Sequence, residues 1–159
     1  MKTIPLTKGK VAIVDDDMFE ELSQYKWYCD SYGYAVRTVS SRPGKPKTIW
    51  MHRVICGTPA GMETDHINEK KLDNRRENLR RCTSAENRRN IKKPTNNTSG
   101  YKGVNWLKRN RKWRAEIKVN GKKKHLGCFD DLLAAAHAYD QAARERFGIF
   151  AKTNFEAAP

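Results

Sequence analysis

The chain has 159 residues, enough for one domain or for two small ones, and carries a formal net charge of +14 from 32 Lys and Arg against 18 Asp and Glu. No uncharged apolar run approaches the ~18 to 20 residues of a membrane-spanning helix, and the opening MKTIPLTKGK lacks the apolar region of a secretory signal. We therefore expect a cytoplasmic protein that is neither inserted in a membrane nor secreted.

The first 60 residues mix short apolar runs with turn residues. Alternating apolar and polar side chains over Lys10–Val14 and over residues 34–38 predict two strands. The segment DDDMFEELSQYKW is typical of a short helix with an acidic first turn. We expect a small α+β subdomain here whose role is to supply core for the segment that follows.

The next segment has the order strand, loop, strand, helix. METDHI and ENLRRCT predict the two strands, joined by a turn-rich loop. Thr83 and Glu86 have the spacing of a capping box, which predicts a helix from Thr83 to about Asn90. The hairpin must fold over to bury its apolar residues, which we expect to be Ile67, Leu79 and Cys82.

Four polar residues of this segment suit the cleavage of a phosphodiester bond. Asp65 and Asn87 offer a carboxylate and a carboxamide oxygen, hard ligands that fit Mg²⁺. His66 points to the other side of the strand and suits the removal of a proton from water. Asn78 would hold either the imidazole or the backbone in place.

This pattern resembles a known family. Asp65-His66, an asparagine 12 residues after the histidine and another 9 residues later, with MHR before and NRRN after, is similar to the HNH nucleases of phage and intron-encoded homing type. The resemblance covers residues 50–90 and implies a ββα-metal fold and single-metal hydrolysis of DNA. It implies Asp65 and Asn87 as metal ligands, His66 as the general base and Asn78 as a structural clamp. The expected metal is Mg²⁺, with Mn²⁺ as the alternative, and no small-molecule cofactor is expected.

A change of composition follows. KKPTNNTSG around Pro94 predicts a linker over residues 93–100, between domains at residues 1–92 and 101–157. From residue 67 to residue 125 the chain has 20 basic and 5 acidic residues, so the positive charge is local. A local surplus favours a nucleic acid as partner over a merely solvated basic face.

The sequence of the last domain predicts three antiparallel strands and one helix. The strands are the runs YKGVNWL, KWRAEIKV and KKHLGCF, with Asn120-Gly121 as the turn between the last two. A helix begins after Asp130 or Asp131. Its predicted apolar face contains Leu133, Ala136, Tyr139 or Asp140, Ala143 and Phe147.

Residues 101–155 also resemble a family, the plant ethylene-response-factor (APETALA-type) DNA-binding domain, through YKGV, KWRAEI, HLGCF, AAAHAYDQAA and TNF. The resemblance implies that the sheet enters the major groove of DNA. The contacting positions that it implies are Asn105, Leu107, Arg109, Glu116, Lys118, Lys123 and His125. Several of these differ from the plant domains, so the plant target sequence is not carried over.

The side chains themselves support a DNA-binding face. Arg114, Glu116 and Lys118 alternate with apolar residues and should face DNA together, where Arg can bind guanine and Glu cytosine. Residues expected to contact phosphates are Lys108, Arg109, Arg111, Lys122 and Lys124.

The sequence thus predicts an α+β protein that is a metal-dependent DNA endonuclease of the homing type, acting on double-stranded DNA. A monomer would nick one strand and a homodimer would cut both. The alternative is a non-catalytic DNA-binding protein or regulator on an HNH scaffold. An RNA-binding protein is disfavoured, because the aromatic residues that would stack on bases are expected in the core.

Overall fold

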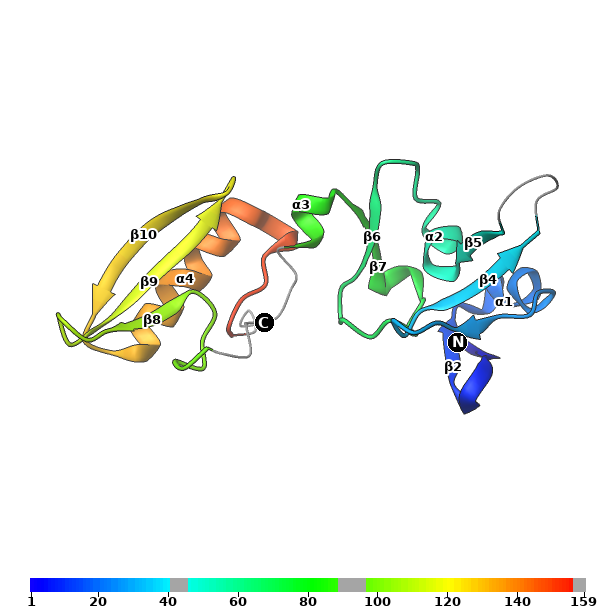
Figure 1. Ribbon diagram of the computed structural model, residues 1–159, viewed down its shortest axis with the longest axis horizontal. Helices are drawn as coiled ribbons and strands as arrows, with labels where there is room; N and C mark the ends of the chain where they lie inside the picture. The colour runs from blue at the N-terminus through cyan, green and yellow to red at the C-terminus, as the bar shows by residue number, and fades with distance from the viewer. Residues whose placement is uncertain (41–45, 89–96, 156–159) are drawn as a thin grey trace. The chain divides into compact units, whose positions relative to one another are not determined.

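The computed structural model describes residues 1–40, 46–88 and 97–155 (Figure 1). The chain forms two compact units, Met1–Asn87 and Arg88–Pro159, which we call unit 1 and unit 2. Both combine short strands with helices, so the mixed α+β class is confirmed. Within the described ranges, no helix is long and apolar enough to cross a membrane.

Unit 1 begins with an antiparallel hairpin of β1 (Lys2–Pro5) and β2 (Val11–Val14), joined through a 3-10 helix at Thr7–Gly9. The helix α1 (Asp16–Ser23) follows, with Asp15 at its N-cap position. Two further aspartates in its first turn suit the positive end of the helix dipole. The predicted short helix with an acidic beginning is therefore present.

A second antiparallel sheet has the strand order β3 (Tyr28–Cys29), β4 (Ala35–Val39) and β5 (Lys47–Trp50). The helix α2 (Met51–Cys56) comes directly after β5 and ends at Gly57. Gly57 has a φ of 57°, the left-handed conformation that commonly ends helices.

The core of unit 1 gathers side chains from both sheets and both helices. Trp27 is 5 % exposed, and its indole N–H donates to the Leu22 carbonyl at 2.8 Å, which satisfies its polar atom. The buried cluster comprises Ile4, Leu6, Ala12, Val14, Leu22, Trp27, Cys29, Ala35 and Met51. The first 60 residues thus supply core, as the sequence predicts.

The segment with the polar residues has the expected order. The strands β6 (Glu63–His66) and β7 (Leu79–Cys82) pair antiparallel, a 3-10 helix at Arg76–Asn78 precedes β7, and α3 (Ser84–Asn87) follows it. The helix was predicted to reach Asn90, but α3 ends at Asn87, and residues 89 and 90 lie outside the described ranges.

The predicted burial of Ile67 is wrong, because its side chain is 43 % exposed, whereas Leu79 and Cys82 are buried as predicted. Ile67 lies one residue beyond β6, where the chain enters the loop, and its N–H donates to the Asn78 carbonyl at 2.9 Å while its side chain stays at the surface. An apolar residue next to the end of a strand is therefore not necessarily buried.

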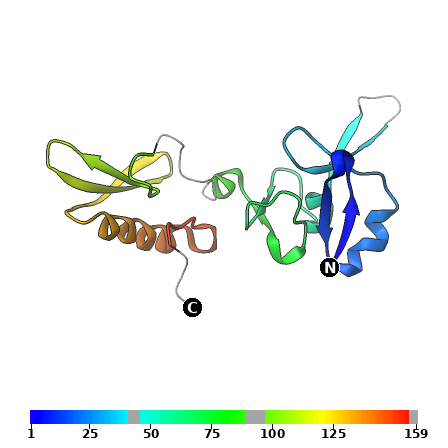
Figure 2. The same ribbon diagram turned by 90° about the horizontal axis from the view of Figure 1, so that it is seen from below.

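Unit 2 contains an antiparallel sheet of order β10-β9-β8 and one long helix. The strands are β8 (Val104–Leu107), β9 (Lys112–Val119) and β10 (Lys122–Phe129). Asn120 and Gly121 have φ values of 49° and 80°, so the predicted hairpin turn is present. The helix α4 (Leu132–Phe147) lies along one face of the three strands (Figures 1 and 2).

The helix α4 begins as predicted, at the second of the two candidate N-cap aspartates. Asp131 is the N-cap, and its carboxylate accepts the N–H of Ala134 at 2.7 Å. Leu132 packs against the core, whereas Leu133 is 47 % exposed, so the predicted core position of Leu133 is wrong. The buried positions of α4 are Ala135, Ala136, Tyr139, Asp140, Ala142 and Ala143. Four of these six are alanines, whose small side chains let the helix approach the sheet closely.

Part of the predicted linker belongs structurally to unit 2. Residues 93–96 lie outside the described ranges. Ser99 is 8 % exposed and donates to the Val104 carbonyl at 2.8 Å, and the Asn97 amide donates to the Tyr101 carbonyl at 2.7 Å. The limits 1–92, 93–100 and 101–157 stay predictions for the functional domains.

Candidate active site

The register of β6 and β7 sorts the polar residues onto two faces. Glu63 lies opposite Cys82, and Asp65 lies opposite Arg80. Because side chains alternate along a strand, Glu63 and Asp65 share one face of β6 and His66 projects from the other. An acid and an imidazole that are adjacent in sequence therefore have different surroundings.

Asp65 is held by an arginine from the neighbouring strand. Nε and Nη2 of Arg80 donate to Oδ2 of Asp65 at 2.8 and 2.7 Å. The two side chains are 6 % and 13 % exposed, for Asp65 and Arg80 respectively. A buried carboxylate needs such a partner, and the guanidinium also fixes its orientation.

Asn87 lies at the end of α3, and the predicted capping box holds this helix. The Glu86 carboxylate accepts the N–H of Thr83 at 2.7 Å, and Thr83 Oγ1 accepts the N–H of Glu86 at 3.2 Å. The side chain of Asn87 turns back toward β6, where Nδ2 donates to Oε2 of Glu63 at 2.6 Å. The structure therefore brings Asn87 to the face that carries Asp65.

His66 is buried, with 5 % of its surface exposed, and Asn74 orients its ring. Nε2 of His66 lies 3.1 Å from Oδ1 of Asn74. The Asn74 amide nitrogen donates instead to the Leu72 carbonyl at 3.4 Å, so the atom facing the imidazole is an acceptor. Nε2 therefore carries the hydrogen, and in the neutral ring Nδ1 is the basic nitrogen.

Two rings pack around His66. The His52 ring meets it edge-on at 5.1 Å between centroids, and the Tyr34 ring lies 5.9 Å away. Burial lowers the pKa of His66 below its ordinary value and lowers the pKa of His52 to about 3. Both imidazoles are therefore neutral near pH 7. His52 is 7 % exposed and packs against the Tyr34 ring, with 5.1 Å between the ring centroids.

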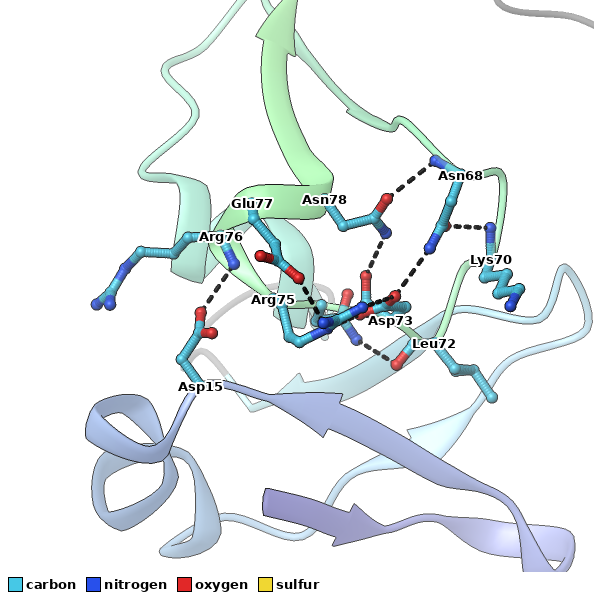
Figure 3. Close-up of polar contacts among 10 residues, drawn as sticks. Asp15, Asn68, Lys70, Leu72, Asp73, Arg75, Arg76, Glu77 and Asn78 are labelled. Carbon is cyan, nitrogen blue, oxygen red and sulfur yellow. Dashed lines mark hydrogen bonds and ion pairs between the residues drawn. The ribbon is translucent and has the colours of Figure 1, made fainter. Parts of the chain in front are cut away.

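The loop between β6 and β7 is closed by a network centred on Asp73 and Asn78 (Figure 3). Asn78 Oδ1 accepts the N–H of Asn68 at 2.9 Å, and Nδ2 donates to the Asp73 carbonyl at 2.7 Å. The Asp73 carboxylate accepts from the Asn68 amide and from Nε and Nη2 of Arg75, each at 2.8 Å. Asn78 thus holds the loop backbone, whereas Asn74 holds the imidazole.

The same loop is fastened to the first hairpin of the chain. The Ile13 N–H donates to the Leu72 carbonyl, and the Asn74 N–H donates to the Ile13 carbonyl, both at 2.8 Å. The Arg76 N–H donates to the Asp15 carboxylate at 2.8 Å (Figure 3). The N-terminal segment therefore supports the residue that orients His66.

The donor set fits a hard divalent cation. The Asp65 carboxylate and the Asn87 carboxamide offer oxygen atoms on one side of β6, the donors that Mg²⁺ and Mn²⁺ prefer. Among the described residues, no group of three or more His, Cys, Asp and Glu is placed to hold a metal. The predicted ligands are only one carboxylate and one carboxamide, so the remaining coordination positions of the cation would be filled by water and phosphate oxygens.

The comparison with known proteins identifies the family. Residues 50–89 match the model of the HNH endonuclease family. Protein 3.8 of Escherichia phage T7 is 37 % identical over 94 residues, which cover 59 % of this chain and 77 % of that protein. An uncharacterised HNH endonuclease of Acanthamoeba polyphaga mimivirus is 31 % identical over 147 residues, 92 % of this chain and 76 % of that protein. The chain belongs to the HNH endonuclease family.

Membership of this family supports nuclease activity and implies a DNA substrate. HNH nucleases generally use a divalent metal ion. A further match is partial. An AP2-like ethylene-responsive transcription factor of Arabidopsis thaliana is 42 % identical over 62 residues, 39 % of this chain and 13 % of that protein.

Three residues near the HNH site are not predicted from the sequence. Asn74 lies in the turn-rich loop, where asparagine is common, so nothing local marks it as the partner of His66. Glu63 could have been found from the sequence, because it lies two residues before Asp65 on the same strand and the two side chains must therefore share one face. Arg80 was counted only among the basic residues, and its pairing with Asp65 depends on the strand register.

In unit 2 the register brings together most of the predicted DNA-binding residues. Direct cross-strand partners share a face, so the side of the sheet opposite α4 carries Asn105, Leu107, Arg114, Glu116, Lys118, Lys123 and His125. Lys108, Arg109 and Arg111 are exposed in the turn between β8 and β9. Lys122 and Lys124 pair with Val119 and Ile117, which places them on the helix side of β10.

Glu116 lies among cations on this face. Its carboxylate is 2.7 Å from Nζ of Lys123 and 3.1 Å from Nε of Arg114. Lys118 and Lys123 are opposite each other in the register, so a carboxylate beside them offsets part of the repulsion. The predicted contact between Glu116 and cytosine would require the carboxylate to leave these partners.

Proposed function

We propose that the protein is a metal-dependent DNA endonuclease of the homing type, in which unit 1 hydrolyses a phosphodiester bond and unit 2 binds the DNA. The observation that carries the proposal is the arrangement on β6. Asp65 and His66 project from opposite faces, Arg80 fixes the acid, Asn74 fixes the imidazole, and α3 returns Asn87 to the acid's face. Membership of the HNH endonuclease family supports the same function.

Asp65 and Asn87 would hold the cation, Mg²⁺ or alternatively Mn²⁺. When bound, the cation supplies charge compensation at the phosphate and at the leaving oxygen. Arg80 keeps the Asp65 carboxylate oriented. The ββα-metal arrangement is supported by the order β6, β7, α3.

His66 would act as the general base. Because Nε2 carries a hydrogen toward Asn74 Oδ1, the proton of the attacking water would go to Nδ1. The neighbouring His52 and Tyr34 rings restrict the rotation of the imidazole. Asn78 would act indirectly, by holding the loop that carries Asn74.

Unit 2 would bind duplex DNA through the face of the sheet opposite α4. The major groove admits a β-ribbon, and the partial similarity to an AP2-like transcription factor supports this role for the three-stranded sheet. Asn105, Arg114 and His125 would approach base edges, and Lys108, Arg109 and Arg111 would contact phosphates from the turn between β8 and β9. Lys122 and Lys124 project from the other side of the edge strand β10, so they would reach phosphates past the edge of the sheet.

The test incubates the full chain with supercoiled plasmid and Mg²⁺ or Mn²⁺, beside EDTA and a His66→Ala variant. We expect nicked or linear product that requires metal, and a loss of about 100-fold or more in rate for His66→Ala. His137→Ala, an exposed histidine on α4, is the matched control. Linear product formed directly would indicate a homodimer, and nicked product a monomer. Intact plasmid with a retarded gel band would support the non-catalytic alternative.

A further inference from the structure

We propose that Glu63 is a positioning residue of the metal site, which holds the Asn87 carboxamide so that Oδ1, and not Nδ2, is presented to the divalent cation. This inference rests on the proposed function of unit 1. It adds to the HNH residues a side chain that acts on the cation through Asn87.

The first step concerns the direction of one hydrogen bond. Nδ2 of Asn87 lies 2.6 Å from Oε2 of Glu63. An ionised carboxylate only accepts hydrogen bonds, so the nitrogen of the amide must be the atom on the Glu63 side. Since the amide group is planar, Oδ1 then points away from Glu63.

The second step concerns the cation. Mg²⁺ and Mn²⁺ bind the oxygen of a carboxamide, whereas the NH₂ group carries partial positive charge and repels them. An asparagine that is free to turn about its last torsion would present either atom. Glu63 removes this choice, and its charge makes the bond about twice as strong as one between neutral groups.

The third step concerns rigidity. Glu63 lies on β6 opposite Cys82, which is fully buried, and the capping box of Thr83 and Glu86 fixes the turn that carries Asn87. The backbone of Asn87 is fixed as well, because its N–H donates to the Thr83 carbonyl at 2.9 Å. The backbone is thus set by α3, and the side-chain orientation is set by Glu63.

The test measures Mn²⁺ affinity of the full chain by electron paramagnetic resonance, with no DNA present. Glu63→Gln places two amides face to face, and neither amide then dictates the orientation of the other. We expect about tenfold weaker Mn²⁺ binding, the usual effect of removing an outer-shell partner. Thermal midpoints in EDTA should stay equal to wild type. Glu20→Gln removes the same charge from an exposed site of α1 and should bind Mn²⁺ like wild type.

Glu63→Asp separates positioning from simple loss of charge, because it keeps the charge but is one methylene too short to hold Nδ2 of Asn87. It should bind Mn²⁺ as weakly as Glu63→Gln. A double variant tests the exchange of donor and acceptor. Glu63→Gln combined with Asn87→Asp exchanges donor and acceptor, because the new amide donates to the new carboxylate, which presents an oxygen in either orientation. We expect Mn²⁺ affinity to recover most of the tenfold loss. Equal affinity in wild type and Glu63→Gln, or no recovery in the double variant, would overturn the inference alone. A wild-type protein that binds no Mn²⁺ would overturn the metal-dependent function and this inference with it.

Discussion

Among single residues, Gly103 combines a left-handed backbone with a close contact. Its φ is 77°, and a Cβ there would lie 2.0 Å from Cδ2 of Tyr139, whose ring is buried in the core of unit 2. We expect Gly103→Ala to destabilise unit 2 by about 3 kcal/mol or more, from the left-handed conformation and the overlap together. Urea denaturation measures this change in the free energy of unfolding.

A second glycine provides the control. Gly100 has a φ of 81°, but a Cβ there would meet no atom within 4 Å. Gly100→Ala should therefore cost only the backbone contribution, about 1 to 2 kcal/mol. Equal destabilisation at both positions would show that the Tyr139 ring moves aside, so that its proximity does not require a glycine at position 103.

Asp73 makes the stability of unit 1 depend on pH. Hydrogen bonds from Arg75, and then from Asn68, lower the pKa of this buried carboxyl from 3.8 to about 2. A pKa that is lower in the folded state stabilises the fold above the unfolded pKa, and the contribution disappears as the pH falls from about 4 to about 2. At pH 7 it amounts to about 2 kcal/mol.

We expect Asp73→Asn to be less stable than wild type by about this amount at pH 7, with a gap that closes toward pH 2 in urea titrations. Asp17→Asn removes an exposed partner of Arg76 and should change stability far less. If the gap for Asp73→Asn is the same at pH 7 and pH 2, the ionised carboxylate is not the source of the stability.

Elements whose signals are local could be predicted from the sequence. The capping box at Thr83 and the Asn120-Gly121 turn each follow from residues a few positions apart, and both are present. Ile67 and Leu133 were assigned to the core because they are apolar, but the face of an element that becomes buried is chosen by packing from elsewhere in the chain. The prediction of α4 is therefore right in type and at its N-cap, Asp131, and wrong for the core position of Leu133.

The candidate site shows the same division. Asp65, His66, Asn78 and Asn87 have motif spacing, which a sequence displays directly. Asn74 and Arg80 act through contacts that require the loop to be docked on Ile13 and the strands to be in register. Such partners become visible only when long-range pairing is known.

The helix α3 is short enough for its cap to control the metal site. Glu86→Ala removes the carboxylate that accepts the Thr83 N–H, which should cost about 1 kcal/mol of stability and loosen Asn87. We expect weaker Mn²⁺ binding by calorimetry. Glu86→Gln is the control, because a glutamine also completes a capping box. Unchanged Mn²⁺ affinity in Glu86→Ala would mean that α3 keeps its position without the cap.

At the scale of the whole molecule, the charges are distributed unevenly. Residues 88–159 contain 17 Lys and Arg against 6 Asp and Glu, whereas residues 1–87 contain 15 against 12. The candidate metal ligands lie in unit 1, and most of the net positive charge lies in unit 2. If the units have separate tasks, substitutions in each should change different parameters of the same reaction.

We expect the double substitution Lys108→Ala and Arg109→Ala to raise the Kd for DNA. It should also lower the slope of log affinity against log salt by about 2, one unit for each phosphate that the protein no longer neutralises. Its kcat at saturating DNA and its Mn²⁺ affinity should match wild type, whereas His66→Ala should have a lower kcat and keep the Kd. Arg144→Ala with Arg146→Ala removes equal charge from α4, away from the binding face, and should leave the Kd nearly unchanged. A fall in kcat for the first pair would mean that unit 2 also positions the scissile phosphate, because binding alone does not change the rate at saturation.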